Sequence, residues 1–272
     1  MFEHSTSPPS GSKKAEAVSW FPWLRSMMRR KPNAGRASGV AASTADEPAR
    51  GEPVDPNWVP KLRFGVESVV GNVREHNEDN FYVPGRLPLQ SGAYLSQTAD
   101  FNEPTVDVAP LPGPRDLIVV ADGMGGQLAG EQASKIAVEI IPRQVNRRLQ
   151  ENSVESRVVL ETIRESVADA NAQILSLAGV NSEYQNMGTT VVLVFFRDKR
   201  VYVAGIGDSR AYRLRESNLE RLTKDHSLAD ALGEAGTIRM EDVAQHKFKH
   251  VLYLYLGSKE ARDGPDPKEI RN

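Results

Sequence analysis

Residues 117–126 read LIVVADGMGG, and this stretch decides the fold. Its first four residues form a continuous apolar run, which predicts a strand buried on both faces of a sheet. The strand is expected to end at Asp122, and the glycines that follow predict a loop in which the backbone can approach a ligand closely. The sequence therefore places the Asp122 carboxylate at the mouth of a sheet.

A glycine-rich loop after a strand is also typical of nucleotide-binding proteins. Residues 123–130 read GMGGQLAG, which lacks the GxGxxG spacing of dinucleotide-binding loops, and the chain has no GK[ST] sequence. Asp122 would also put negative charge beside the phosphates. The segment after Asp122 keeps a helical pattern for too long to lead into a second parallel strand, so the dinucleotide interpretation is rejected.

The flanking patterns predict an α+β fold. Alternating polar and apolar residues predict a half-buried strand at 61–67, and a short strand follows at 81–83. Apolar residues at spacings of three and four predict amphipathic helices at 130–150 and 154–178. A strand meander follows, its first hairpin turning at Asp198 and Lys199, with strands at 189–196, 200–206, 211–215 and 219–223. This order indicates sheets with helices packed outside them.

The prolines divide the chain, because they gather in residues 1–57 and again in residues 84–114. The first segment has little periodic apolar content, which predicts a disordered tail at 1–57 before a domain at 58–272. Within the domain, 84–116 is predicted to be a proline-rich insert. The tail segment 19–32, SWFPWLRSMMRRKP, sets aromatic residues beside basic ones and could dock on a membrane surface or in a partner groove. Pro22 interrupts any helix there, which favours a segment without a function.

Composition excludes several classes of protein. The formal net charge of −2 argues against nucleic acid as the main partner. The absence of cysteine rules out disulfides, thiolate zinc sites, iron–sulfur clusters and cysteine nucleophiles. No stretch approaches the roughly 20 apolar residues that span a bilayer, and the first residues lack the apolar core of a leader peptide. We therefore predict a cytoplasmic protein.

Acidic residues at strand ends or tight turns are the candidate metal ligands: Glu78, Asp79, Asp122 and Asp208. Carboxylate oxygens at rigid positions suit magnesium or manganese. An aspartate in a turn can instead form hydrogen bonds with its own backbone and bind no metal, and this alternative stays open for Asp208. Arg74, four residues before Glu78, could hold a phosphate through two parallel hydrogen bonds, or could form an ordinary surface ion pair.

Several motifs in order resemble one known family. They are GNVREHNEDNF, VVADGMGG, MGTTVVLVFF, VYVAGIGDSRAYRL, LTKDHS and LYLYLGS. This order is similar to that of the metal-dependent protein serine/threonine phosphatases of type 2C (PPM type), particularly the bacterial ones. The resemblance runs from about residue 61 to residue 263.

The resemblance implies a four-layer αββα fold, with a central antiparallel β-sandwich flanked by helix pairs. It implies hydrolysis of phosphoserine and phosphothreonine on proteins by a water that bridges two manganese or magnesium ions, a third ion being possible. The implied substrates are targets of a serine/threonine kinase. By motif position, the implied roles are phosphate binding for Arg74, a water-mediated metal contact for Glu78, a neighbouring acid for Asp79, the bridging carboxylate for Asp122, a carbonyl ligand for Gly123 and a further metal position for Asp208.

Two departures from the family pattern affect the functional expectation. Met124 stands where many eukaryotic members have a histidine proposed to protonate the leaving group, and methionine has no proton to donate. The later Asp-Gly strand and Asp-Asn pair of the family are absent, so the C-terminal strands are expected to be missing and this chain to be weakly active or inactive. The alternative is a non-catalytic phosphatase-like module that binds partners.

Overall fold

The computed structural model describes residues 63–70, 72, 76–84, 97–100, 116–125, 127–149, 155–197 and 199–270. The predicted tail at 1–57, with its aromatic and basic segment, lies outside the described residues, as does Arg74. The remaining candidate site residues lie inside them.

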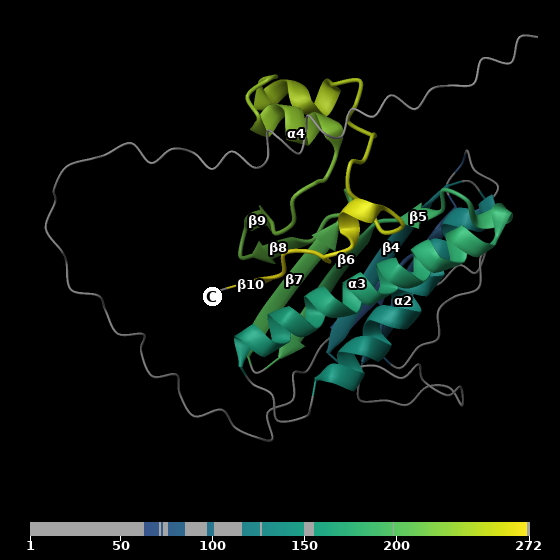
Figure 1. Cartoon of the computed structure of the whole chain (residues 1–272). Helices are drawn as coiled ribbons and strands as arrows, with labels where there is room; N and C mark the ends of the chain where they lie inside the picture. Colours follow the sequence, from purple (N-terminus) through teal and green to yellow (C-terminus); the bar gives the residue numbers. More distant parts are fainter. Residues whose placement is uncertain are drawn as a thin grey trace, which may run out of the picture. The chain divides into compact units, whose positions relative to one another are not determined.

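In the described part of the chain, two consecutive long helices lie between two groups of strands. In chain order the strands and helices are β1 (Arg63–Val66), β2 (Asp79–Tyr82), β3 (Gln97–Asp100), β4 (Leu117–Met124), α2 (Gln127–Arg148), α3 (Ser156–Val180), β5 (Gly188–Thr189), β6 (Val191–Arg197), β7 (Arg200–Ile206), β8 (Tyr212–Arg215), β9 (Asn218–Arg221), α4 (Leu228–Glu234) and β10 (Lys268–Ile270). Short 3₁₀ helices lie at Ser182–Tyr184, Met240–Gln245 and Lys259–Ala261. Figure 1 labels α2 to α4 and β4 to β10, and its colours follow the sequence.

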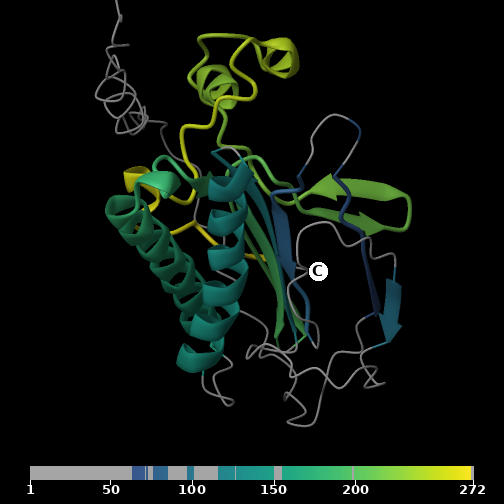
Figure 2. The same cartoon turned by 90° about the vertical axis from the view of Figure 1, so that its right-hand side faces the viewer.

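One antiparallel sheet forms the centre, with strand order β10-β7-β6-β4-β2 and β5 paired to the end of β4. The other described strands form two separate pairs, β1 with β3 and β8 with β9. Helices α2 and α3 contact each other, and α2 packs on β4 and β2. Figure 2 shows both helices on one face of the sheet. The α+β class is confirmed by this arrangement.

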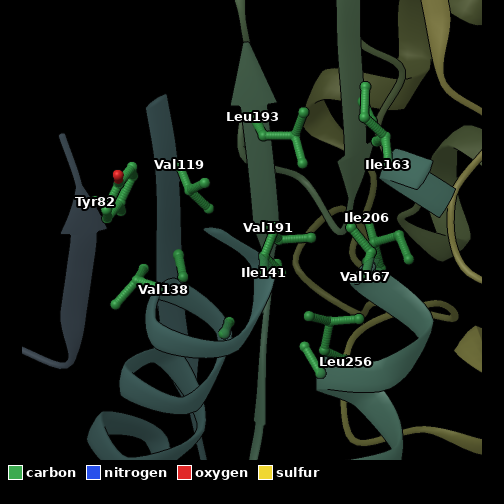
Figure 3. Packing of buried hydrophobic residues seen from close by; sticks show 14 of the residues in the cluster. Tyr82, Val119, Val138, Ile141, Ile163, Val167, Val191, Leu193, Ile206 and Leu256 are labelled. Carbon is green, nitrogen blue, oxygen red and sulfur yellow. The ribbon is translucent and has the colours of Figure 1, made fainter. Parts of the chain in front are cut away.

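The core lies between that face and the two helices. Strand β4 presents alternate residues to α2, and Leu117, Val119 and Ala121 are fully buried. Helix α3 contributes buried apolar side chains three and four residues apart, including Ile163 and Val167. Figure 3 shows the side chains from sheet and helices meeting. Each large aliphatic side chain buried here contributes roughly 1.5–3 kcal/mol of stability.

Two expectations about the deciding stretch were wrong. The strand is not buried on both faces, since Val120 on its second face is 41% exposed. It also continues through Asp122 and Gly123 to Met124, so these residues belong to β4 and not to a loop. Pairing with β2 and β5 on opposite sides supplies the hydrogen bonds that keep this end extended.

The predicted meander is interrupted, because β8 and β9 form a hairpin outside the central sheet. The chain leaves the sheet at Gly207, whose φ of +95° is a conformation that favours glycine. Helix α4, β10 and the strand β3 inside the proline-rich insert had not been predicted. The other strands and both long helices lie within a few residues of their predicted positions.

Candidate functional site

The structure pairs two of the candidate carboxylates across neighbouring strands. Asp79 of β2 lies directly opposite Asp122 of β4, and both residues are exposed. Directly opposed residues of an antiparallel pair project to the same face. Here that face is the one turned away from α2. Two like charges in this position destabilise a sheet by themselves, and a cation shared between them removes the repulsion.

Glu78 lies differently from its neighbour. It is 9% exposed, and its Oε2 atom lies so close to the Cα of Gly130 in α2 that any β-carbon at position 130 would overlap it. A glycine inside a helix is unfavourable by about 1 kcal/mol relative to alanine. The contact with Glu78 explains why glycine occupies this position.

Buried Ser134 of α2 fixes the backbone at Glu78. Its Oγ lies 2.6 Å from the Glu78 carbonyl oxygen, to which it donates, and it accepts a hydrogen bond from Asn80 Nδ2 at 2.9 Å. The same carbonyl accepts a second bond from the Gly123 amide at 3.2 Å. Glu78, β4 and α2 are therefore joined through one carbonyl group.

Gly123 fills a position where no side chain fits. A β-carbon there would overlap the carbonyl oxygen of Gly130 and lie 2.7 Å from that of Glu78. Glycine at 123 is thus required for the close approach of α2 to β4, independently of the metal contact that the family resemblance implies.

The backbone of Asp122 is held from the other side by two buried threonines. Thr190 accepts a hydrogen bond from the Asp122 amide on its Oγ1 at 3.1 Å. The Asp122 carbonyl accepts from the Thr190 amide and from Thr189 Oγ1, both at 2.9 Å. Both backbone groups of Asp122 are therefore satisfied, which fixes the origin of its side chain.

Asp208 follows the turn at Gly207 and is half-buried. Its neighbour Ser209 lies 2.6 Å from Thr190, hydroxyl to hydroxyl, which links this turn to the Asp122 backbone. His226 also holds the turn, because its Nδ1 lies 3.1 Å from the Gly207 amide nitrogen, from which it accepts a hydrogen bond. Burial lowers the pKa of His226, an effect larger than the opposing one of its Gly207 hydrogen bond.

A cavity of about 560 Å³ opens beside Asp208. Asp225 forms its charged wall, with a side chain 4% exposed that binds Arg210 through both carboxylate oxygens and Arg221 at 2.8 Å. The hydrogen bond to Asp225 is the largest cause that raises the pKa of Arg210 above its ordinary value.

The candidate residues are thus brought together only in part. Asp79, Asp122 and Gly123 share one sheet edge with the Glu78 backbone, while Asp208 reaches it through Thr190 and Ser209. Among the described residues, no group of three or more histidine, aspartate or glutamate side chains is arranged to hold a metal ion. Arg74 is not placed.

Sequence reasoning missed the residues that hold this edge together: Gly130, Ser134, Thr190 and His226. A glycine and a serine inside an amphipathic helix, and two threonines at the start of an apolar strand, were the available signals. In the part of the chain that the structure describes, no helix is long and apolar enough to cross a membrane.

Comparison with known proteins shows the family. The family model described as protein phosphatase 2C matches residues 111–252, just over half of the chain, and the chain belongs to this family. It is 32% identical over 190 residues to the serine/threonine phosphatase stp of Listeria welshimeri, an alignment that covers 69% of this chain and 64% of the Listeria protein. The chain thus spans less than two thirds of that relative's length.

Solved structures agree. The serine/threonine phosphatase Stp1 from Staphylococcus aureus has a TM-score of 0.56 and 28% identity, covering 79% of this chain and 72% of that one. The catalytic domain of the phosphatase PstP, described in complex with two manganese ions, has a TM-score of 0.51 at 23% identity, covering 78% and 71%. The family resemblance stated from the motifs is confirmed.

Proposed function

We propose that this chain is a metal-dependent protein phosphatase that removes phosphate from phosphoserine and phosphothreonine. The observation that carries this proposal is the pair of exposed carboxylates, Asp79 and Asp122, opposite each other on one face of the central sheet. The family and its named bacterial phosphatases support the reaction, and the manganese in PstP supports the choice of metal.

The residues present fit a divalent cation. Carboxylate oxygens are the ligands that magnesium and manganese prefer, and Asp79 and Asp122 place two carboxylates opposite each other on one face of the sheet. Asp122 and Asp79 would hold the metal, with Gly123 offering its carbonyl and Asp208 serving a further position. When bound, such ions activate water and neutralise charge on a transferring phosphate.

The chain itself contributes rigidity and charge placement. Hydrogen bonds to Thr189 and Thr190 hold the Asp122 backbone, so that only the side-chain torsions of Asp122 have to be ordered when a ligand binds. Arg74 would bind two phosphate oxygens through its guanidinium. Met124 cannot protonate the leaving group, so that proton would come from water or from another group.

The substrates would be phosphorylated proteins, products of a serine/threonine kinase. A cytoplasmic location and weak activity of this chain both stay predictions from the sequence. The alternative is a non-catalytic binding module. Such a protein would bind a phosphopeptide without releasing phosphate from it.

The test is release of phosphate from a phosphothreonine peptide, with manganese and with a chelator, for the unsubstituted chain. We expect slow manganese-dependent release. Binding of the peptide with no release at any manganese concentration would favour the binding module. Release that persists in the chelator would contradict metal dependence.

A further inference from the structure

Thr190 contacts two parts of the candidate site, the strand that carries Asp122 and the turn that carries Asp208. It sits between β5 and β6, is 1% exposed, and is held by both backbone groups of Asp122. Its Oγ1 accepts the hydrogen bond from the Asp122 amide. The threonine is therefore a fixed point relative to the strand that carries this carboxylate.

The same side chain contacts the turn that carries Asp208. Thr190 Oγ1 lies 2.6 Å from Ser209 Oγ, and a hydroxyl can accept from the Asp122 amide while sharing its own proton with a second hydroxyl. A β-carbon added at Gly207 would lie 2.6 Å from Thr190 Cγ2 and 2.7 Å from its Cβ. The hydroxyl therefore bonds the turn while the methyl group packs against it.

We propose that Thr190 is a positioning residue that sets the spacing between Asp122 and Asp208, and thereby how tightly this edge holds a divalent cation. The proposal rests on the proposed function and adds to it the element that joins the two carboxylates. They are 86 positions apart in the chain, and Thr190 is the described residue whose side chain bonds both the Asp122 backbone and the neighbour of Asp208.

Neighbouring Thr189 has another task. Its hydroxyl also bonds the Asp122 carbonyl, but its backbone pairs with Leu256, whose amide donates to the Thr189 carbonyl at 2.9 Å. Thr189 thus ties Asp122 to the 252–258 segment, and Thr190 ties it to the Asp208 turn. This difference makes position 190 the one whose hydroxyl affects the distance between the two acids.

The experiment measures manganese affinity directly, by water-proton relaxation, which detects even weak binding, together with thermal melting. The variants are Thr190→Val, which keeps the shape and removes the hydroxyl, and Thr190→Ser, which keeps the hydroxyl. Thr162→Val, a buried threonine of α3, is the matched control. We expect about tenfold weaker manganese binding in Thr190→Val, because residues that orient metal ligands typically contribute 10- to 100-fold to affinity. Thr190→Ser should recover most of it, and Thr162→Val should bind as the unsubstituted chain does.

Each other outcome contradicts a definite statement. Equal manganese affinity in Thr190→Val and the unsubstituted chain overturns the positioning role and leaves the proposed function intact. No manganese binding by the unsubstituted chain overturns the proposed function, and the positioning role with it. If Thr190→Val does not fold, Ser209→Ala decides, since it removes the partner hydroxyl at a half-buried position. Unchanged affinity in Ser209→Ala then overturns the proposal, and a several-fold loss supports it.

Discussion

Two regions of the candidate site differ in how they are stabilised. We call the end of β4 with the facing parts of β2 and α2 the Asp122 edge, and the segment from Asp208 through β8 and β9 to Asp225 the Asp208 arm. At the Asp122 edge, neutral hydrogen bonds from buried hydroxyls and close packing at glycines join β2, β4 and α2. The Asp208 arm leads to an exposed hairpin and is held largely by charges, with Asp225 binding two arginines. Packing should therefore contribute most to the stability of the Asp122 edge, and ion pairs most to the stability of the Asp208 arm.

The largest expected effect is on activity at the packed edge. Asp122→Ala should lower manganese-dependent phosphopeptide hydrolysis by about 100- to 1,000-fold, a typical loss when a group that stabilises transition-state charge is removed. The fold should survive, because the side chain is exposed and its removal relieves repulsion from Asp79. Activity and thermal melting are measured on the same sample. Substantial turnover in the variant would show that Asp122 is not part of the catalytic site.

The second prediction concerns the glycines of the packed edge. Gly123→Ala should lower the free energy of unfolding by about 2–4 kcal/mol, because the new methyl group meets backbone atoms that cannot move aside easily. Gly179→Ala in α3 is the matched control, since nothing lies within 4 Å of its added carbon. The control should be neutral or gain up to about 1 kcal/mol from helix propensity. Urea unfolding measures both, and equal effects would contradict the close approach of α2.

The contrast between the regions also explains what could be predicted from sequence. Long elements with a clear period, α3 above all, were predicted to within a few residues because local apolar spacing reports the buried face. Leu117 to Val120 was assigned as doubly buried, since a short apolar run does not reveal how much covers its second face. Strand β3 lies within the proline-rich insert, and its sequence shows no strand pattern of its own. It is paired with β1, which is distant in the sequence, and local spacing does not reveal such pairing.

The site divides in the same way. Asp122, Asp79 and Asp208 could be proposed as candidates from motif order, since each motif is a contiguous stretch of the chain. Ser134 and Thr190 could not, because their bonds join residues 56 and 68 positions away. Such long-range hydrogen bonds arise only after the sheet and helices have packed, and no local spacing encodes them.

The third prediction tests the charge-held arm. Asp225→Asn should lower the free energy of unfolding by about 1–2 kcal/mol at low salt, less than the 3–5 kcal/mol of a fully buried pair, because Arg210 and Arg221 are partly exposed and can be hydrated. The loss should shrink in 1 M salt, which screens the pair. Glu220→Gln, which breaks the exposed pair with Arg213, is the control and should cost under about 1 kcal/mol. A salt-independent loss at Asp225 would show that packing holds this arm too.

The smallest effect is expected from the histidine that joins the arm to the sheet. Burial lowers the pKa of His226 in the folded chain, whereas the unfolded chain has the ordinary value of about 6.5. As pH falls below that value, the unfolded state binds a proton before the folded state does, so the free energy of unfolding decreases. The contribution is therefore fully present above about pH 7 and is lost on acidification.

A non-titrating replacement isolates this effect. His226→Asn keeps an oxygen able to accept the Gly207 amide hydrogen and removes the ring proton, so its free energy of unfolding should depend less steeply on pH between about 7 and 5. The difference in slope should amount to less than about 1.4 kcal/mol per pH unit, the most that one proton can contribute. Urea unfolding across this range measures it for both chains. An unchanged slope would mean that His226 binds protons equally in the folded and unfolded states, which would contradict a pKa lowered by burial.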